Sequence, residues 1–124
     1  MALRILVVDD HPSFRRALIS ALRMVREIEV IGEVDGGIPA VENAGPSGAD
    51  LVLMDLSMPD IDGIEAMRRI HEIKPELPVV ILTAHADPGI EREAMAAGAS
   101  GFLAKGVSLE ELVAVLRQAT AARV

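Results

Sequence analysis

Hydrophobic residues are grouped into five short runs, separated by longer segments in which they recur periodically. The runs occupy residues 3–8, 29–34, 51–54, 79–82 and, more weakly, 101–104. Near-continuous branched runs such as Ile5-Leu6-Val7-Val8 are typical of strands that are buried on both faces of a parallel sheet. We therefore predict five strands, most of them in the centre of a sheet covered by helices.

The segments between the runs show helical spacing. After Pro12, a residue suited to a first helical turn, an apolar stripe predicts an amphipathic helix. The stripe consists of Phe14, Leu18, Leu22 and Val25. Further helices are predicted before Pro75, before the C-capping Gly98, and after Ser108, where Ser-x-x-Glu fits a capping box.

The segment from Asp35 to Asp50 is rich in glycine and proline, which leaves only residues 39–45 for a short second helix. Strand and helix thus alternate five times. This alternation predicts a doubly wound α/β fold, with a parallel sheet, right-handed crossovers and helices on both faces. At about 150 residues per domain, the 124 residues predict a single domain.

Composition narrows the classes of function. The net charge is −7 and the pI about 4.9, so we expect no direct nucleic-acid binding. Without cysteine there is no disulfide, thiolate metal site or cysteine nucleophile, which fits a reducing cytoplasm. The first apolar run ends at Val8, too early for a membrane span or a signal-peptide core. A soluble, cytoplasmic protein without membrane contact is expected.

Polar residues follow the predicted strands directly. Asp9 and Asp10 come after the first, Asp55 after the third, Thr83 after the fourth and Lys105 after the fifth. Ligands of open parallel sheets bind beyond the carboxyl ends of the strands. We therefore expect three carboxylates, a hydroxyl and an amine to meet at one edge of the sheet.

Each of these residues also has a purely structural interpretation. Asp10 could cap the first helix, Thr83 could bond to turn backbone, and Lys105 could be a solvated surface lysine. Asp55 is harder to explain in this way, because an apolar run delivers it directly from the interior of the sheet. The coincidence of all of them favours a functional site.

Electrostatics favours a bound cation at this edge. Two carboxylates about 5 Å apart repel by roughly 3 kcal/mol at an effective dielectric near 20, and three cannot all stay ionised uncompensated. Oxygen ligands without a cysteine or histidine cluster suit Mg²⁺. A carboxylate can also act as the nucleophile in phosphoryl transfer.

Four segments resemble the signature segments of bacterial two-component response-regulator receiver domains. They are residues 5–11, 50–63, 80–84 and 101–105, and they occur in order and at the family's spacing over nearly the whole chain. The resemblance implies a flavodoxin-like sheet with strand order 2-1-3-4-5. It thereby places Asp9 and Asp10 beside Asp55.

The same resemblance implies roles for these residues. Asp55 would accept a phosphoryl group from a sensor histidine kinase. Asp10 and Asp55, with the backbone carbonyl of Ser57, would ligate Mg²⁺, and Asp9 would assist through bound water. The domain would act as a switch that phosphorylates and dephosphorylates itself, not as a turnover enzyme.

Signal transmission is implied as well. Thr83 and Lys105 would contact the phosphoryl oxygens, and Phe102 matches the switch aromatic of the family. The surface of helix four, strand five and helix five would then change, with homodimerisation as one expected consequence. From the residues alone, Phe102 is simply a core phenylalanine.

Residues 102–112 are similar to the NarL/FixJ-type subclass, whose members continue into a helix-turn-helix DNA-binding domain. We expect residues 1–124 to be the receiver domain alone, with control of transcription through an output domain absent from this chain. A stand-alone receiver is the alternative. Gly106 departs from the family, since many members have proline after the lysine.

Three rival functions fit the sequence less well. A haloacid-dehalogenase-like phosphatase requires two aspartates separated by one residue, whereas Asp9 and Asp10 are adjacent. In a flavodoxin-like cofactor binder these aspartates would repel the phosphate. A non-catalytic interaction module is disfavoured by the intact Asp55, Thr83 and Lys105.

The three histidines, His11, His71 and His85, are interpreted as ordinary loop or helix residues, although His11 and His85 lie beside the expected site.

Overall fold

The computed structural model describes residues 2–121, which form five strands and five helices. The strands are β1 (Leu3–Val8), β2 (Ile28–Val34), β3 (Leu51–Met54), β4 (Val79–Thr83) and β5 (Gly101–Ala104). The helices are α1 (Pro12–Leu22), α2 (Gly37–Ala44), α3 (Gly63–Ile73), α4 (Pro88–Ala96) and α5 (Leu109–Ala121). All neighbouring strands are parallel, in the order β2-β1-β3-β4-β5. The predicted fold class, strand order and short second helix are confirmed.

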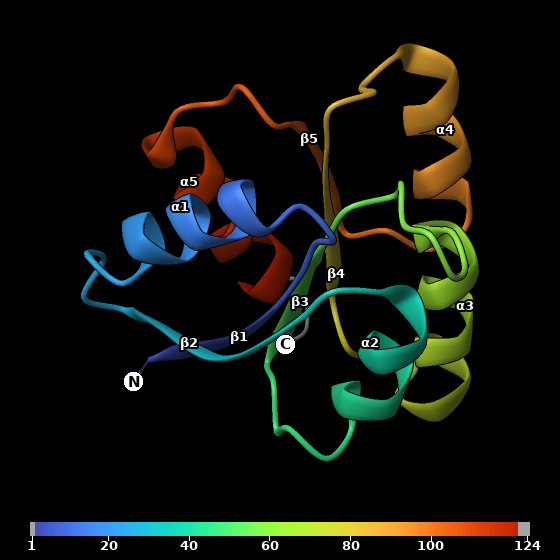
Figure 1. The fold of residues 1–124 in the computed structure, drawn as a ribbon, viewed down its shortest axis with the longest axis horizontal. Helices are drawn as coiled ribbons and strands as arrows, with labels where there is room; N and C mark the ends of the chain where they lie inside the picture. The colour runs from blue at the N-terminus through green and yellow to red at the C-terminus, as the bar shows by residue number, and fades with distance from the viewer. Residues whose placement is uncertain (1, 122–124) are drawn as a thin grey trace.

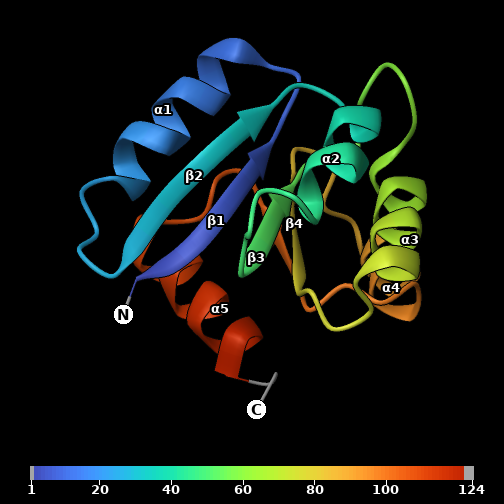
Figure 2. The same cartoon turned by 90° about the horizontal axis from the view of Figure 1, so that it is seen from below.

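The sheet lies between two layers of helices (Figures 1 and 2). Helices α1 and α5 cover one face, and α2, α3 and α4 cover the other. Successive strand residues point to opposite faces, so Ile5 and Val7 pack under α1 and α5, whereas Leu6 and Val8 pack on the other side. This double burial explains the near-continuous apolar runs. None of the described helices is both long and apolar enough to cross a membrane.

Helix α1 is shorter than its apolar stripe predicts. It ends at Leu22, with Arg23 as C-cap, and Val25 N–H donates to Leu22 O at 3.0 Å in the following turn. Val25 still packs against the core under α1 and α5. The stripe therefore identifies the side chains that face the core but not the last helical residue, because a tight turn can keep the same face buried.

Helix α2 begins at Gly37, two residues before the predicted segment 39–45. The carboxylate of Asp60, in the connection between β3 and α3, accepts hydrogen bonds from Gly37 N–H at 3.0 Å and Ile38 N–H at 2.7 Å. The first turn is thus capped from a distant segment. These backbone hydrogen bonds, that of Ile38 first, hold the pKa of Asp60 below its ordinary value.

Local signals at other helix ends are confirmed. Gly98, with φ of +116°, follows the C-terminus of α4, as expected for a C-capping glycine. At the start of α5, Glu111 N–H donates to Ser108 Oγ at 3.1 Å, which is one half of the predicted capping box. These short-range bonds fix the ends of the helices that flank β5.

Candidate functional site

The carboxyl ends of β1 and β3 deliver three aspartates to one place. Val8 pairs with Met54 in the β1–β3 register, so Asp9 and Asp55, the next residues, emerge side by side. Both are only 2% exposed. Ligand atoms of Asp9, Asp10, His11 and Asp55 all lie within 4.8 Å of one another. We call these four residues the acidic cluster. The predicted convergence of the carboxylates is therefore present in the structure.

Lys105 follows the edge strand β5, and its side chain contacts two residues of this cluster. Its Nζ lies 2.8 Å from Asp9 Oδ2 and 3.0 Å from Asp55 Oδ2, and 4.4 Å from the centre of the Phe14 ring. Burial alone lowers the pKa of Lys105, but the hydrogen bonds to Asp9 and Asp55 outweigh it and raise that pKa above its ordinary value. The interpretation of Lys105 as a solvated surface lysine is therefore wrong.

Asp10 retains an unsatisfied oxygen. Its Oδ1 is buried and has no hydrogen-bond partner among the described residues, although His11 Nδ1 lies 3.3 Å away. The N-cap of α1 is His11, without a side-chain capping bond, so the interpretation of Asp10 as a helix cap is wrong. A buried carboxylate oxygen without a donor is costly, and a cation would satisfy it.

The charge of the cluster also suits a cation. Three carboxylates and the Lys105 ammonium leave two uncompensated negative charges when the His11 ring is neutral. Carboxylate oxygens are the ligands that hard divalent cations prefer. The pocket is compatible with a divalent metal ion.

The two oxygens of Asp55 have different environments. Oδ1 accepts from Leu56 N–H at 2.7 Å and more weakly from Ser57 N–H at 3.4 Å. These two backbone groups of the following loop hold the carboxylate in its orientation. Oδ2 accepts from Lys105 Nζ and lies 3.8 Å from His11 Nδ1. Asp55 Oδ2 is therefore the oxygen directed at the other cluster residues.

Thr83 and Phe102 lie on neighbouring strands. Thr83 is fully buried at the end of β4, and its Oγ1 accepts from His85 N–H at 3.2 Å, as the structural interpretation of a strand-end hydroxyl expects. Phe102 lies opposite Ile81 in the β4–β5 register and packs, half-buried, against the core on the α4 side of the sheet. Their roles in signalling remain predictions.

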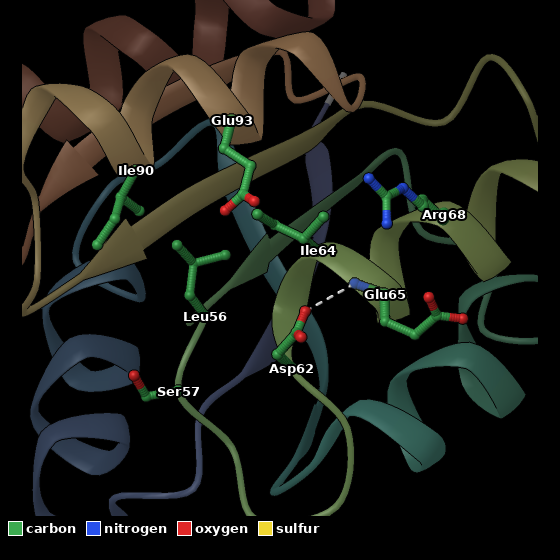
Figure 3. Close-up of a pocket in the computed structure, with 8 residues that line it drawn as sticks. All are labelled: Leu56, Ser57, Asp62, Ile64, Glu65, Arg68, Ile90 and Glu93. Atoms are coloured by element: carbon green, nitrogen blue, oxygen red, sulfur yellow. Dashed lines mark hydrogen bonds between the residues drawn. The ribbon is translucent and has the colours of Figure 1, made fainter.

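A hollow of about 340 Å³ lies next to the acidic cluster, between α3 and α4 (Figure 3). Its lining combines apolar, acidic and other polar side chains: Leu56, Ser57, Asp62, Ile64, Glu65, Arg68, Ile90 and Glu93. Ser57 is the only predicted site residue among them, and it stands apart from the others in this view. The four residues of the acidic cluster are not among those that line this hollow.

Three residues near the site make contacts that the sequence pattern did not indicate. Phe14, assigned only to the core stripe, lies against Lys105. Arg15 donates from Nη1 to the backbone oxygen of Asp9 at 2.6 Å and from Nε to Glu33 at 2.7 Å. His11 lies within the cluster and not merely beside it. Their position in the first turn after a strand that ends in two aspartates is the sequence signal that could have identified them.

The other two histidines behave as predicted. His71 is half-buried in α3, and its Nε2 lies 2.9 Å from Leu77 O. His85 is exposed and contributes its backbone N–H to Thr83.

Comparison with known proteins agrees with this arrangement. A family model of the response regulator receiver domain matches residues 5–117. The response regulator UvrY of Escherichia coli K12 is 36% identical over 115 residues, 93% of this chain and 53% of that protein. The response regulator GacA of Pseudomonas aeruginosa is 36% identical over 116 residues, 94% of this chain and 54% of that protein. The chain thus spans about half the length of these curated relatives.

Solved structures give the same picture. A LuxR-family two-component response regulator from an Aurantimonas species superposes with a TM-score of 0.93 at 31% identity, over 99% of this chain and 88% of that one. The response regulator domain of CheB from Thermotoga maritima gives a TM-score of 0.90 at 32% identity, over 98% of each chain. The sequence, the fold and the acidic cluster all agree with these relatives. The chain belongs to the response regulator receiver domain family.

Proposed function

We propose that this receiver domain is a phosphorylation-dependent switch in which Asp55 accepts a phosphoryl group from a sensor histidine kinase. The observation that carries the proposal is the position of Asp55 Oδ2, 3.0 Å from Lys105 Nζ and inside the acidic cluster. A nearly buried carboxylate held in this way is oriented as a nucleophile.

The transfer balances as a displacement at phosphorus. An Asp55 carboxylate oxygen forms the new O–P bond, the P–N bond to the kinase imidazole breaks, and that nitrogen keeps the electron pair and takes up a proton. The Lys105 ammonium, 3.0 Å from Asp55 Oδ2, would neutralise charge on the phosphoryl oxygens, and the Thr83 hydroxyl would donate to one of them. Hydrolysis of the acyl phosphate then resets the switch, so it turns over no separate substrate.

Mg²⁺ is the cation that we propose for the cluster. Asp10 and Asp55, with the backbone carbonyl of Ser57, would hold it, and Asp9 would assist through bound water. The unsatisfied Asp10 Oδ1 and the two uncompensated charges support this assignment. When bound, the ion offsets negative charge on the transferred phosphoryl group.

Control of transcription is the output that we infer for the whole protein. The relatives of about twice this length include the "Transcriptional regulatory protein DegU" of Brevibacillus brevis, which is 32% identical over 115 residues. We infer that residues 1–124 act as the receiver of a cytoplasmic regulator whose DNA-binding domain lies outside them. A stand-alone receiver and a non-catalytic interaction module are the alternatives.

Intact mass spectrometry after incubation with acetyl phosphate and Mg²⁺ tests the proposal. The native chain should gain the mass of one phosphoryl group as acetate leaves, and Asp55→Asn should gain none. Asp35→Asn, at an exposed carboxylate in the connection after β2, is the matched control and should be modified like the native chain. Equal modification of Asp55→Asn would show that another residue is the acceptor. An unmodified native chain would favour the interaction module.

A further inference from the structure

His11 places a ring nitrogen among the carboxylates. Its Nδ1 lies 3.1 Å from Asp9 Oδ1, 3.3 Å from Asp10 Oδ1 and 3.8 Å from Asp55 Oδ2. Neighbouring ligands of an octahedral ion with bonds of about 2.1 Å lie about 3 Å apart. The ring nitrogen and Asp10 Oδ1, the unsatisfied oxygen 3.3 Å away, therefore have the mutual spacing of adjacent ligands around one cation.

The local backbone holds this ring in place. His11 precedes Pro12, which disfavours helical torsion angles, and it adopts an extended conformation with φ of −95° and ψ of 102°. Its N–H donates to Asp9 Oδ1 at 2.8 Å. The side chain of His11 is 58% exposed, whereas those of Asp9 and Asp55 are 4% and 2% exposed. The imidazole thus lies on the solvent side of the cluster.

The chemistry of a nitrogen ligand differs from that of a fourth carboxylate. Mg²⁺ prefers oxygen and keeps several waters, whereas imidazole favours ions such as Co²⁺ and Ni²⁺. A neutral imidazole also adds a ligand without adding charge to a cluster that already carries two uncompensated negative charges.

We propose that His11 determines the metal selectivity of this site, by adding Nδ1 to the oxygen ligands when the bound ion is a divalent transition metal. The inference rests on the cation site of the proposed function. It assigns to this site a second class of metal ion, divalent transition metals such as Co²⁺. These ions would bind through His11, a residue that Mg²⁺ does not need.

A rival explanation treats the 3.1 Å contact as a simple hydrogen bond from Nδ1–H to Asp9 Oδ1. A hydrogen bond that orients Asp9 would support every cation alike, so its loss would change the affinities for Mg²⁺ and Co²⁺ in parallel. A directly ligating nitrogen affects only the ion that uses it. The ratio of the two affinities therefore distinguishes the explanations.

Calorimetric titration of the metal-free chain with MgCl₂ and with CoCl₂, at a pH above the ordinary pKa of histidine, measures this ratio. His11→Ala should weaken Co²⁺ binding by about tenfold or more, the size of change that even supporting residues of metal sites produce. Its Mg²⁺ affinity should stay at the native value, because Mg²⁺ does not use this nitrogen as a ligand. His85→Ala, at the exposed histidine beside the same edge, is the matched control and should bind both ions like the native chain.

The visible absorption bands of bound Co²⁺ provide a second readout, which should shift in His11→Ala and not in His85→Ala. Parallel losses for both ions, or unchanged Co²⁺ affinity and spectrum in His11→Ala, would overturn the assignment while leaving the Mg²⁺ site intact. Failure of the native chain to bind either ion would instead overturn the cation site of the proposed function, and the His11 proposal with it.

Discussion

Asp10 is the cluster carboxylate with the least compensation. Lys105 contacts Asp9 and Asp55, and backbone N–H groups satisfy Asp9 Oδ1 and Asp55 Oδ1. Asp10 Oδ1 has no hydrogen bond within residues 2–121. Asp10 is therefore the carboxylate whose repulsion by its neighbours is least offset. Its negative charge stabilises the protein only when a cation is bound.

Asp10→Asn should stabilise the metal-free protein and weaken its response to Mg²⁺. One carboxylate pair at this spacing repels by roughly 3 kcal/mol at an effective dielectric near 20, and Lys105 and solvent offset part of it, so we expect a gain of about 1 kcal/mol. Urea unfolding followed by circular dichroism measures it, since the chain has no tryptophan or tyrosine. Because Mg²⁺ stabilises only a state that binds it, the native chain should gain stability with Mg²⁺ and the variant much less. A variant that is less stable without metal, or that responds to Mg²⁺ like the native chain, would contradict this expectation.

At the scale of elements, the position of Asp55 depends on a close backbone contact. The start of α3 packs against the backbone that directly follows β3. Gly63, the first residue of α3, donates its N–H to Leu56 O at 2.8 Å. A Cβ at this position would lie 2.5 Å from Asp55 O and 2.8 Å from Leu56 Cα. Both contacts are with backbone, which cannot swing aside as a flexible side chain can.

Gly63→Ala should therefore destabilise the fold by about 2 kcal/mol through overpacking and slow phosphorylation of Asp55. Gly45→Ala is the matched control. It lies at the C-cap of α2 with φ of −75° and ψ of −59°, and an added Cβ meets nothing within 4 Å. There alanine should stabilise by about 0.5 kcal/mol, because it restricts the unfolded chain. Similar effects at both positions in urea unfolding would show that the contact with the Asp55 backbone is unimportant.

The Asp60 cap of α2 should make stability depend on pH. Hydrogen bonds from backbone N–H groups lower the pKa of Asp60 in the folded state. Its contribution is therefore fully present above the pKa of an unfolded aspartate, about 3.9, and is lost as pH falls through the lower folded pKa. Asp60→Asn should cost up to about 1 kcal/mol at neutral pH, because the amide offers one acceptor oxygen to Gly37 N–H and Ile38 N–H in place of two and removes the negative charge at the start of the helix. That difference should shrink to near zero in acid.

Urea unfolding of both chains over a range of pH measures the difference. Asp35→Asn, at the exposed aspartate that precedes the N-cap Gly36 of the same helix, is the control and should follow the pH profile of the native chain. A loss of stability in Asp60→Asn that is constant from neutral to acid pH would show that the charge of Asp60 does not act through the cap.

At the scale of the whole molecule, we expect a change at the acidic cluster to reach the face formed by α4, β5 and α5. Thr83 pairs with Ala104 in the β4–β5 register, one residue before Lys105, and Phe102 lies two residues further back on the same strand. Phosphorylation adds about −1.5 to −2 charges and three acceptor oxygens, to which Thr83 and Lys105 can form new bonds. Movement of the Thr83 hydroxyl would then bias the neighbouring Phe102 and that face toward one of two states.

Thr83→Ala should still be phosphorylated at Asp55 with Mg²⁺, yet transmit little of the change. NMR shifts on phosphorylation around Ile90, Phe102 and Leu112 should be much smaller than in the native chain. Thr83→Ser, which loses the same methyl group but keeps the hydroxyl, should retain the native shifts. Large shifts in Thr83→Ala would show that the coupling does not pass through this hydroxyl.

The alternation of elements and the positions of the site carboxylates were determined by the sequence alone. Buried parallel strands require apolar residues on both faces, and this requirement produces recognisable runs within a few residues. Parallel strands also place their carboxyl ends at one edge, so Asp9, Asp10 and Asp55 could be assigned to one site before any tertiary contact was known.

Only the tertiary structure decided the contacts between distant segments. Asp60 caps a helix start 23 residues earlier in the chain, and the His11 ring meets Lys105, 94 residues later. The interpretations of Asp10 as a cap and of Lys105 as a solvated lysine were wrong for the same reason. Propensity and periodicity depend on a few neighbouring residues, whereas the partners of a buried polar atom depend on which distant segments the packed sheet and helices bring within bonding distance.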